Sequence, residues 1–86
     1  MIRIVFLGKL ADLAECAELE VTSASGKVDW DSLLALLEER LNPAIASAAS
    51  EDKTKLAING TLLADKLAMA AGDGDEVAFL PPVSGG

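Results

Sequence analysis

The chain has 86 residues, of which 51% are hydrophobic and 24% are charged, and this composition predicts one small globular domain rather than a disordered segment. Fourteen Asp and Glu against seven Lys and Arg give a net charge of −7. This charge argues against binding to nucleic acid or to an anionic membrane surface, and it suits a basic protein partner.

The first part of the chain predicts two strands. Residues 2–7 read as a strand with apolar side chains at alternate positions, and residues 10–13 as a short helical turn or loop. Residues 17–22 alternate between apolar and acidic or polar side chains, which predicts a half-buried antiparallel strand with Ala17 on its inner face. Residues 23–26 read as a loop.

The strongest helix signal lies at residues 30–41. Its apolar side chains recur on one face, at Trp30, Leu33, Leu34, Leu37 and Leu41. Asp29 is suited to cap the helix N-terminus, and Pro43 ends the helix because the residue before a proline disfavours the α conformation. Residues 44–50 are rich in Ala and Ser and predict either a second, weaker helix or an ordered loop.

The second half predicts three more strands. Residues 55–58 form a short strand, Asn59-Gly60 is a strong signal for a type I′ hairpin turn, and residues 61–63 form the return strand. Residues 76–80 form the last strand. Residues 64–71 are a weak candidate for a helix.

This order of elements favours an α+β fold of the β-grasp type, a mixed sheet of about four to five strands with one main helix across it. A ferredoxin-like sandwich would need a second full helix, for which only residues 64–71 are available. We therefore expect a β-grasp domain at residues 1–80 and an extended, flexible C-terminal tail at residues 81–86.

The side chains offer no convincing active site. The sequence has no His and no Tyr, so Ser–His, Cys–His and His–metal arrangements are excluded. Cys16 is the single cysteine, which excludes an intrachain disulfide and is typical of the reducing cytoplasm. Residues 72–75 read as a turn rather than as a metal-binding loop. If the protein takes part in chemistry, we expect it to act as a substrate, carrier or subunit.

The C-terminal tail is the informative feature. Pro81 and Pro82 cannot donate hydrogen bonds to a sheet, so the last strand should stop at Leu80 and continue as a stiff extended segment. Residues 81–86 can reach about 20 Å beyond the domain. Val83-Ser84 is small and Gly85-Gly86 has no side chains. Such a tail can enter a narrow tunnel in another protein and bring its carboxylate to a nucleotide or a cysteine.

Residues 73–86 resemble the end of the small, sulfur-carrying subunit family of molybdopterin synthase: an Asp-Gly-Asp-Glu-Val turn and strand, then Pro-Pro-Val, a small hydroxyl residue and Gly-Gly. Ile58-Asn59 and the Leu10-x-x-Leu13 pattern also fit this family. The resemblance covers essentially the whole chain, although it is loose between residues 23 and 55. The chain departs from the family at Ala11, where a basic residue is common.

The resemblance implies a ubiquitin-like β-grasp fold and a sulfur carrier with no active site of its own. Gly86 would be adenylated by an activating enzyme that uses ATP, and then converted to a thiocarboxylate by a sulfur donor protein. It would deliver sulfur to cyclic pyranopterin monophosphate in the large catalytic subunit, within a cytoplasmic heterotetramer. No cofactor would be bound. The expected partner-contacting residues are Phe79, Pro81, Pro82, Val83, Ser84 and Gly85.

Three alternatives remain open. A carrier for thiamine thiazole synthesis also ends in Gly-Gly, but it tends to be shorter and to lack Pro-Pro-Val. A protein modifier would share the chemistry of Gly86 as far as the adenylate. A β-grasp interaction module would have a tail without chemistry. Phe79 could instead be a core residue, and Leu62 and Leu63 could form either an exposed apolar patch or ordinary core.

Overall fold

The computed structural model describes residues 1–82, so the predicted contacts at Val83, Ser84 and Gly85 and the reactive Gly86 lie outside the described residues. The elements in chain order are β1 (Ile2–Phe6), α1 (Lys9–Ala14), β2 (Glu18–Val21), β3 (Lys27–Asp29), α2 (Trp30–Arg40), α3 (Pro43–Ser50), β4 (Lys55–Ile58), β5 (Thr61–Leu62), the 3₁₀ turn η1 (Lys66–Ala68), β6 (Ala70–Gly72) and β7 (Glu76–Leu80). Among these residues no helix is long and apolar enough to cross a membrane.

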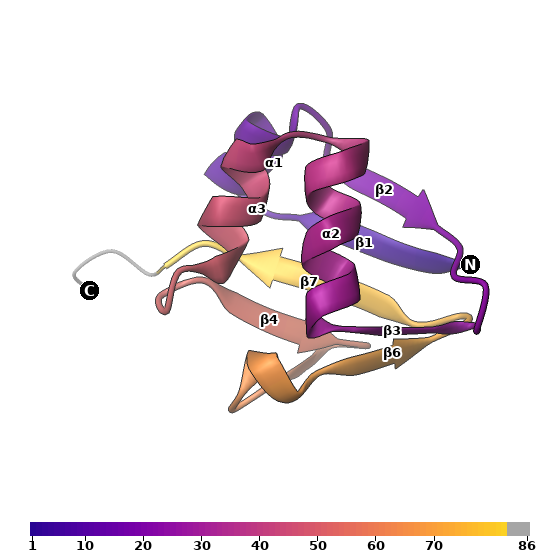
Figure 1. Cartoon of the computed structure of the whole chain (residues 1–86). Coiled ribbons are helices and arrows are strands. Elements are labelled where there is room, and N and C mark those ends of the chain that lie inside the picture. Colours follow the sequence, from indigo (N-terminus) through magenta and orange to yellow (C-terminus); the bar gives the residue numbers. More distant parts are fainter. Residues whose placement is uncertain (83–86) are drawn as a thin grey trace.

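The main sheet has five strands in the order β2-β1-β7-β4-β5. β1 and β7 run parallel at its centre, and the other neighbouring strands are antiparallel. A second, two-stranded sheet pairs β3 with β6. The helices cover one face of the main sheet, with α2 lying across it (Figure 1). This mixed sheet with a helix across it confirms the predicted β-grasp fold.

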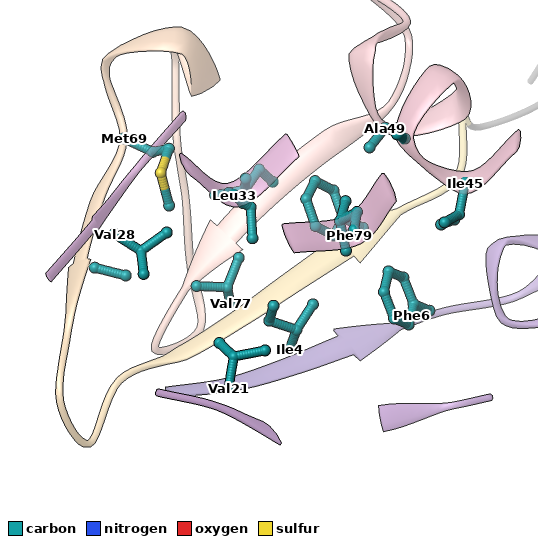
Figure 2. Close-up of a cluster of buried hydrophobic side chains, with 14 of the residues drawn as sticks. Ile4, Phe6, Val21, Val28, Leu33, Ile45, Ala49, Met69, Val77 and Phe79 are labelled. Carbon is teal, nitrogen blue, oxygen red and sulfur yellow. The ribbon is translucent and has the colours of Figure 1, made fainter. Parts of the chain in front are cut away.

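The core lies between the main sheet and the helices. Alternate strand residues point into it, because successive side chains of a strand face opposite sides of the sheet. Figure 2 shows Ile4, Phe6, Val77 and Phe79 reaching from β1 and β7 toward Leu33 of α2 and Ile45 of α3, and all six side chains are buried. The Phe6 and Phe79 rings stack with their centroids 5.9 Å apart.

Side-chain caps fix where the two main helices begin. The Asp29 carboxylate accepts a 2.9 Å hydrogen bond from the Ser32 amide, which confirms the predicted N-cap of α2. The Asn42 side chain accepts a 2.8 Å bond from the Ile45 amide and so caps α3. With this cap, and with Pro43 in the first helical turn, the segment after residue 43 is a helix rather than a loop.

Three details differ from the sequence predictions. The β3–β6 sheet was not predicted, because three residues such as Lys27–Asp29 are too short to show an alternating pattern. Ala17 is exposed and precedes β2, although its carbonyl accepts a 2.8 Å bond from the Phe6 amide. The segment 64–71 contains only the one-turn η1 and the first two residues of β6 instead of a full helix, which removes the ferredoxin-like alternative.

Lys66 joins η1 to the end of α3. Its ammonium donates 2.8 Å bonds to the carbonyls of Ala49 and Thr54 and a further bond to the carbonyl of Glu51. It also lies 5.6 Å from the centre of the Trp30 ring. A cation at a helix C-terminus satisfies carbonyls that have no partner within the helix. Lys66 therefore fixes the connection between α3 and β4.

Replacing Lys66 with methionine is expected to lower the free energy of unfolding by about 2 kcal/mol, because charge-assisted hydrogen bonds to backbone carbonyls are lost while the aliphatic stem is kept. Urea denaturation measures this change. Lys53→Met removes the same charge at an exposed position and is expected to change stability by less than about 0.5 kcal/mol. Equal effects of the two substitutions would contradict this role of Lys66.

Candidate tail root and open sheet face

The tail leaves the domain from the centre of the sheet. β7 lies between β1 and β4 and ends at Leu80, as predicted. This end of the strand lies near α3, on the opposite side of the domain from the N-terminus (Figure 1). The Leu7 amide donates a 3.1 Å bond to the Phe79 carbonyl just before this end. Pro81 and Pro82 then lie half-buried at the domain surface. The first residues of the tail, Pro81 and Pro82, are therefore anchored by a central strand, and we call them the tail root.

The structure corrects the predicted partner contact at Phe79, because this side chain is buried in the core. It is 0% exposed, and its ring stacks on that of Phe6 (Figure 2). The centre of the Trp30 ring lies 6.4 Å from that of Phe79. Phe79 shares its strand face with Val77, and that face is covered by the helices. The ring therefore belongs to the core, and it can influence partners only by holding β7 in place. The predicted contacts of Pro81 and Pro82 remain predictions.

The face of the main sheet away from the helices carries an apolar row, which we call the open-face row. Strand pairing aligns Val5 with Ala78, Ala78 with Ala57, and Ala57 with Leu62. Leu62 is 57% exposed, and Leu80 of β7 lies on the same face as Ala78. The row therefore crosses four strands and lies beside the residues from which the tail departs.

This arrangement separates the two leucines that follow the hairpin turn. Leu62 faces outward, whereas Leu63 is partly buried against the core and its amide donates a 2.9 Å bond to the Leu56 carbonyl. Leu62 thus belongs to an exposed apolar patch, whereas Leu63 packs against the core. The sequence did not predict the open-face row as a whole, because the row depends on the register of strands that are distant in the chain.

Charged side chains border the open-face row. Arg3 of β1 lies 3.8 Å from the Glu18 carboxylate and 3.6 Å from the Glu76 carboxylate, at exposed positions. Glu20 lies opposite Arg3 on β2. The border at this end of the sheet is therefore acidic overall, since three carboxylates surround one guanidinium. At the end of β7 from which the tail leaves, the exposed Lys55 of β4 lies opposite Leu80 on the same face. Only the end of the row away from the tail therefore favours a basic surface on a partner.

The acidic residues before β7 have a structural role. The Asp75 carboxylate accepts bonds of 2.8 Å from the Gly72 amide and 2.9 Å from the Asn59 side-chain amide. Asn59 in turn accepts a 2.9 Å bond from the Glu76 amide. These bonds tie the β4–β5 turn to the start of β7. Residues 72–75 form a turn, as predicted, and the described part of the chain contains no cluster of side chains that could hold a metal ion.

The bonds to Asp75 predict a pH dependence of stability. The Gly72 amide, followed by the Asn59 side chain, lowers the pKa of Asp75 below its ordinary value. The folded state then binds fewer protons than the unfolded state, so the stabilisation is complete above about pH 5 and is lost as the pH falls through the folded pKa. Asp75→Asn should therefore destabilise the protein more at pH 6 than at about pH 3.

Urea denaturation of both proteins across this pH range measures the difference. Asp29 also has a pKa lowered by its bonds to Ser32, but this contribution is the same in both proteins and cancels. Glu38→Gln, at an exposed position of α2, is a matched control that should leave the shape of the curve unchanged. Parallel curves for the wild type and Asp75→Asn would contradict the assignment.

Comparisons with known structures agree with this architecture. The SAMP1 structure from Haloferax volcanii is 26% identical, with a TM-score of 0.72, and the match covers 99% of this chain and 98% of that chain. The small archaeal modifier protein 1 from Methanosarcina acetivorans is 26% identical, with a TM-score of 0.75 and coverage of 99% and 95%. A Pyrococcus furiosus protein named as a molybdopterin converting factor, subunit 1, is 22% identical, with a TM-score of 0.71 and coverage of 95% and 97%.

The fold and these structures define the class as ubiquitin-like β-grasp proteins. The sequence model of the ThiS family matches residues 4–86, so the chain belongs to the ThiS family. A search among curated proteins gives no match. The ThiS-family fold is thus shared here with a protein modifier and with a protein named for molybdopterin conversion, and it is consistent with a ubiquitin-like sulfur carrier.

Proposed function

We propose that this protein is the sulfur-carrier subunit of a molybdopterin synthase. The observation that carries the proposal is the segment 73–86, in which the Asp-Gly-Asp-Glu-Val turn and strand lead through Pro-Pro-Val to Gly-Gly. In the structure this segment begins with the Asp75 turn and continues as the central strand β7, which roots the tail in the middle of the sheet.

In the proposed reaction an oxygen of the Gly86 carboxylate attacks the α-phosphate of ATP on the activating enzyme. A new O–P bond forms, pyrophosphate leaves, and Gly86 becomes an acyl-adenylate. The outer sulfur of a persulfide on a donor protein then attacks the acyl carbon, and AMP leaves as the C–S bond forms. A thiol of a partner protein next attacks the donor's sulfur in this acyl disulfide, so the S–S bond breaks, a disulfide forms between the thiol and the donor, and the thiocarboxylate is released. The resulting thiocarboxylate gives its sulfur to cyclic pyranopterin monophosphate in the large subunit, and addition of water restores the carboxylate. Acid–base groups belong to the partners.

The open-face row supports recognition by these partners. Val5, Ala78 and Leu62, with the 7% exposed Ala57 between them, give an apolar surface beside the tail root, and the carboxylates near Arg3 border its opposite end. We propose that partners contact this row together with Pro81 and Pro82, and that a basic rim on the partner meets the acidic border. The net charge of −7 would also speed the encounter with such a surface.

A second candidate function is protein modification, in which the Gly86 acyl group is transferred to a lysine amine. The similarity over almost the whole chain to two archaeal modifier proteins favours it. The two functions share activation by ATP and differ only in the acceptor of the acyl carbon or of its sulfur. The thiamine carrier remains an alternative for the same reason, because the family match does not distinguish the acceptor.

A comparison of acceptors tests the proposal. The protein with a C-terminal thiocarboxylate, prepared by semisynthesis, is incubated with a molybdopterin synthase large subunit and cyclic pyranopterin monophosphate, or with a thiazole synthase and its substrates. In a third reaction, the protein with its unmodified carboxylate is incubated with activating enzyme, ATP and lysine-containing proteins. We expect molybdopterin and restored carboxylate in the first reaction only. Product in the second reaction alone, or an isopeptide-linked adduct in the third alone, would replace this function with the corresponding alternative.

A further inference from the structure

The tail root lies against a tight turn at the other end of the chain. β1 and β7 run parallel, so both reach the same edge of the sheet. There the chain after β1 turns into α1 through Gly8, and the Leu10 amide donates a 3.1 Å bond to the Leu7 carbonyl to close the turn. Gly8 has φ +57° and ψ −136°, a conformation that glycine adopts far more readily than other residues.

Gly8 also provides space for the proline ring at the tail root. A β-carbon added at Gly8 would lie 3.1 Å from Cγ and 3.9 Å from Cδ of Pro81, so the Pro81 ring would have to move by a few tenths of an ångström. The other glycines with positive φ in the described residues, Gly26, Gly60 and Gly74, would meet nothing within 4 Å. Only at Gly8 does the missing side chain coincide with a contact to the tail root.

Because Pro81 has no N–H group, packing of its ring must hold this residue where a backbone hydrogen bond would otherwise do so. A residue at the end of a strand is ordinarily held to its neighbour by a ladder hydrogen bond from its amide, but proline cannot make one. The direction of the Pro81–Pro82 segment therefore depends on the surface against which the Pro81 ring rests. The bare backbone of Gly8 is part of that surface.

We propose that Gly8 is a positioning residue that sets the direction in which the tail leaves the domain. This inference rests on the proposed function in one respect, since the direction matters because Gly86 must reach the reaction centre of the activating enzyme. A side chain at position 8 would displace the Pro81 ring, and the displacement would grow along the tail. The open-face row would stay intact, so docking would be preserved while the reactive end was misplaced.

The direction of the tail can be measured without any partner. A spin label is attached at Ser84→Cys in a Cys16→Ser background, and its effect on the amide NMR signals of the domain is mapped. Pro81→Ala removes the contact with Gly8, whereas Pro82→Ala removes the neighbouring proline but keeps this contact. Both substitutions lie after β7 and leave the sheet intact. We expect Pro81→Ala and Gly8→Ala to change the pattern of affected amides, and Pro82→Ala to leave it close to that of the parent protein.

The second readout is the rate of adenylation at Gly86, compared at a temperature at which every variant is folded. Gly8→Ala should lower kcat about ten-fold, because small misplacements of a reacting group cost one to two orders of magnitude, with little change in KM. In the Pro81→Ala background the same substitution should lower kcat less than about two-fold. This comparison cancels the backbone strain at position 8, which is present in both backgrounds.

Gly60→Ala is the matched control for strain alone, because Gly60 has φ +84° with open space around it. It should destabilise the protein but leave the tail direction and the kcat of the folded protein unchanged. The inference is overturned if Pro81→Ala gives the same NMR pattern as Pro82→Ala, or if Gly8→Ala lowers kcat equally in both backgrounds. Failure of the proposed function would instead appear as a parent protein that no activating enzyme adenylates, and the NMR comparison would still decide the role of Gly8.

Discussion

Replacement of Phe79 with alanine is expected to lower the free energy of unfolding by about 3–5 kcal/mol. The ring is 0% exposed and lies between Phe6 and Trp30, so its removal leaves a cavity at the centre of the core. A chain of this size has a total stability of roughly 4–13 kcal/mol, so the substitution removes a large share of it. Chemical denaturation followed by the fluorescence of Trp30 measures the loss.

Leu80→Ala provides the matched control, because Leu80 follows Phe79 on β7 and faces the other side of the sheet. We expect it to cost less than about 1.5 kcal/mol and to weaken binding to the activating enzyme or the large subunit. If Phe79→Ala left stability almost unchanged and impaired only binding, Phe79 would be a docking residue, and the assignment of its ring to the core would be wrong.

Removal of Gly86 is expected to lower sulfur loading at least about 100-fold, while the denaturation midpoint stays unchanged. The truncated tail is shorter by about 3.5 Å, so its carboxylate falls short of the α-phosphate when the domain is docked. The deletion removes none of the contacts described for residues 1–82, which explains the unchanged stability. Adenylation, the first step of sulfur loading, is measured by the release of pyrophosphate with a saturating activating enzyme.

Ser84→Ala keeps the length of the tail and is the control for the deletion. With the activating enzyme saturating, it should be loaded at a rate within about three-fold of the wild type, because loss of the predicted contact at Ser84 then affects binding alone and the hydroxyl has no role in the proposed attack. Wild-type loading of the protein that lacks Gly86 would show that the position of the terminal carboxylate is not decisive. Retention of every partner-dependent activity by this protein would favour the interaction module, whose tail has no chemistry.

Local signals in the sequence predicted most of the fold. Asn59 and Gly60 were expected in a type I′ turn, and both have positive φ, at 51° and 84°. Asp29 was expected to cap a helix, and its carboxylate accepts the Ser32 amide. These features depend on residues that are close in the chain, for which the physical chemistry of caps and turns is specific.

Features that depend on distant residues could not be predicted in the same way. The alternation of β7 places Val77 and Phe79 on one face, but only the position of the helices decides that this face is buried. The open-face row requires the register of four strands, and the contact between Gly8 and Pro81 joins the two ends of the chain. The motif around Asp75 pointed to the family, but its hydrogen bonds show a structural role. Asp75 accepts bonds from Gly72 and Asn59 and so joins the turn before β7 to the β4–β5 turn.

The intact mass of the protein tests the central claim most directly. The protein with an unmodified C-terminus is incubated with an activating enzyme, ATP and a sulfur donor, and its mass is compared with that of a sample without ATP. We predict the gain expected for one oxygen replaced by sulfur, located by fragmentation on Gly86 and absent from the protein that lacks this residue. No change in mass, with an activating enzyme that loads a known carrier in parallel, would contradict the assignment of this protein as a sulfur carrier.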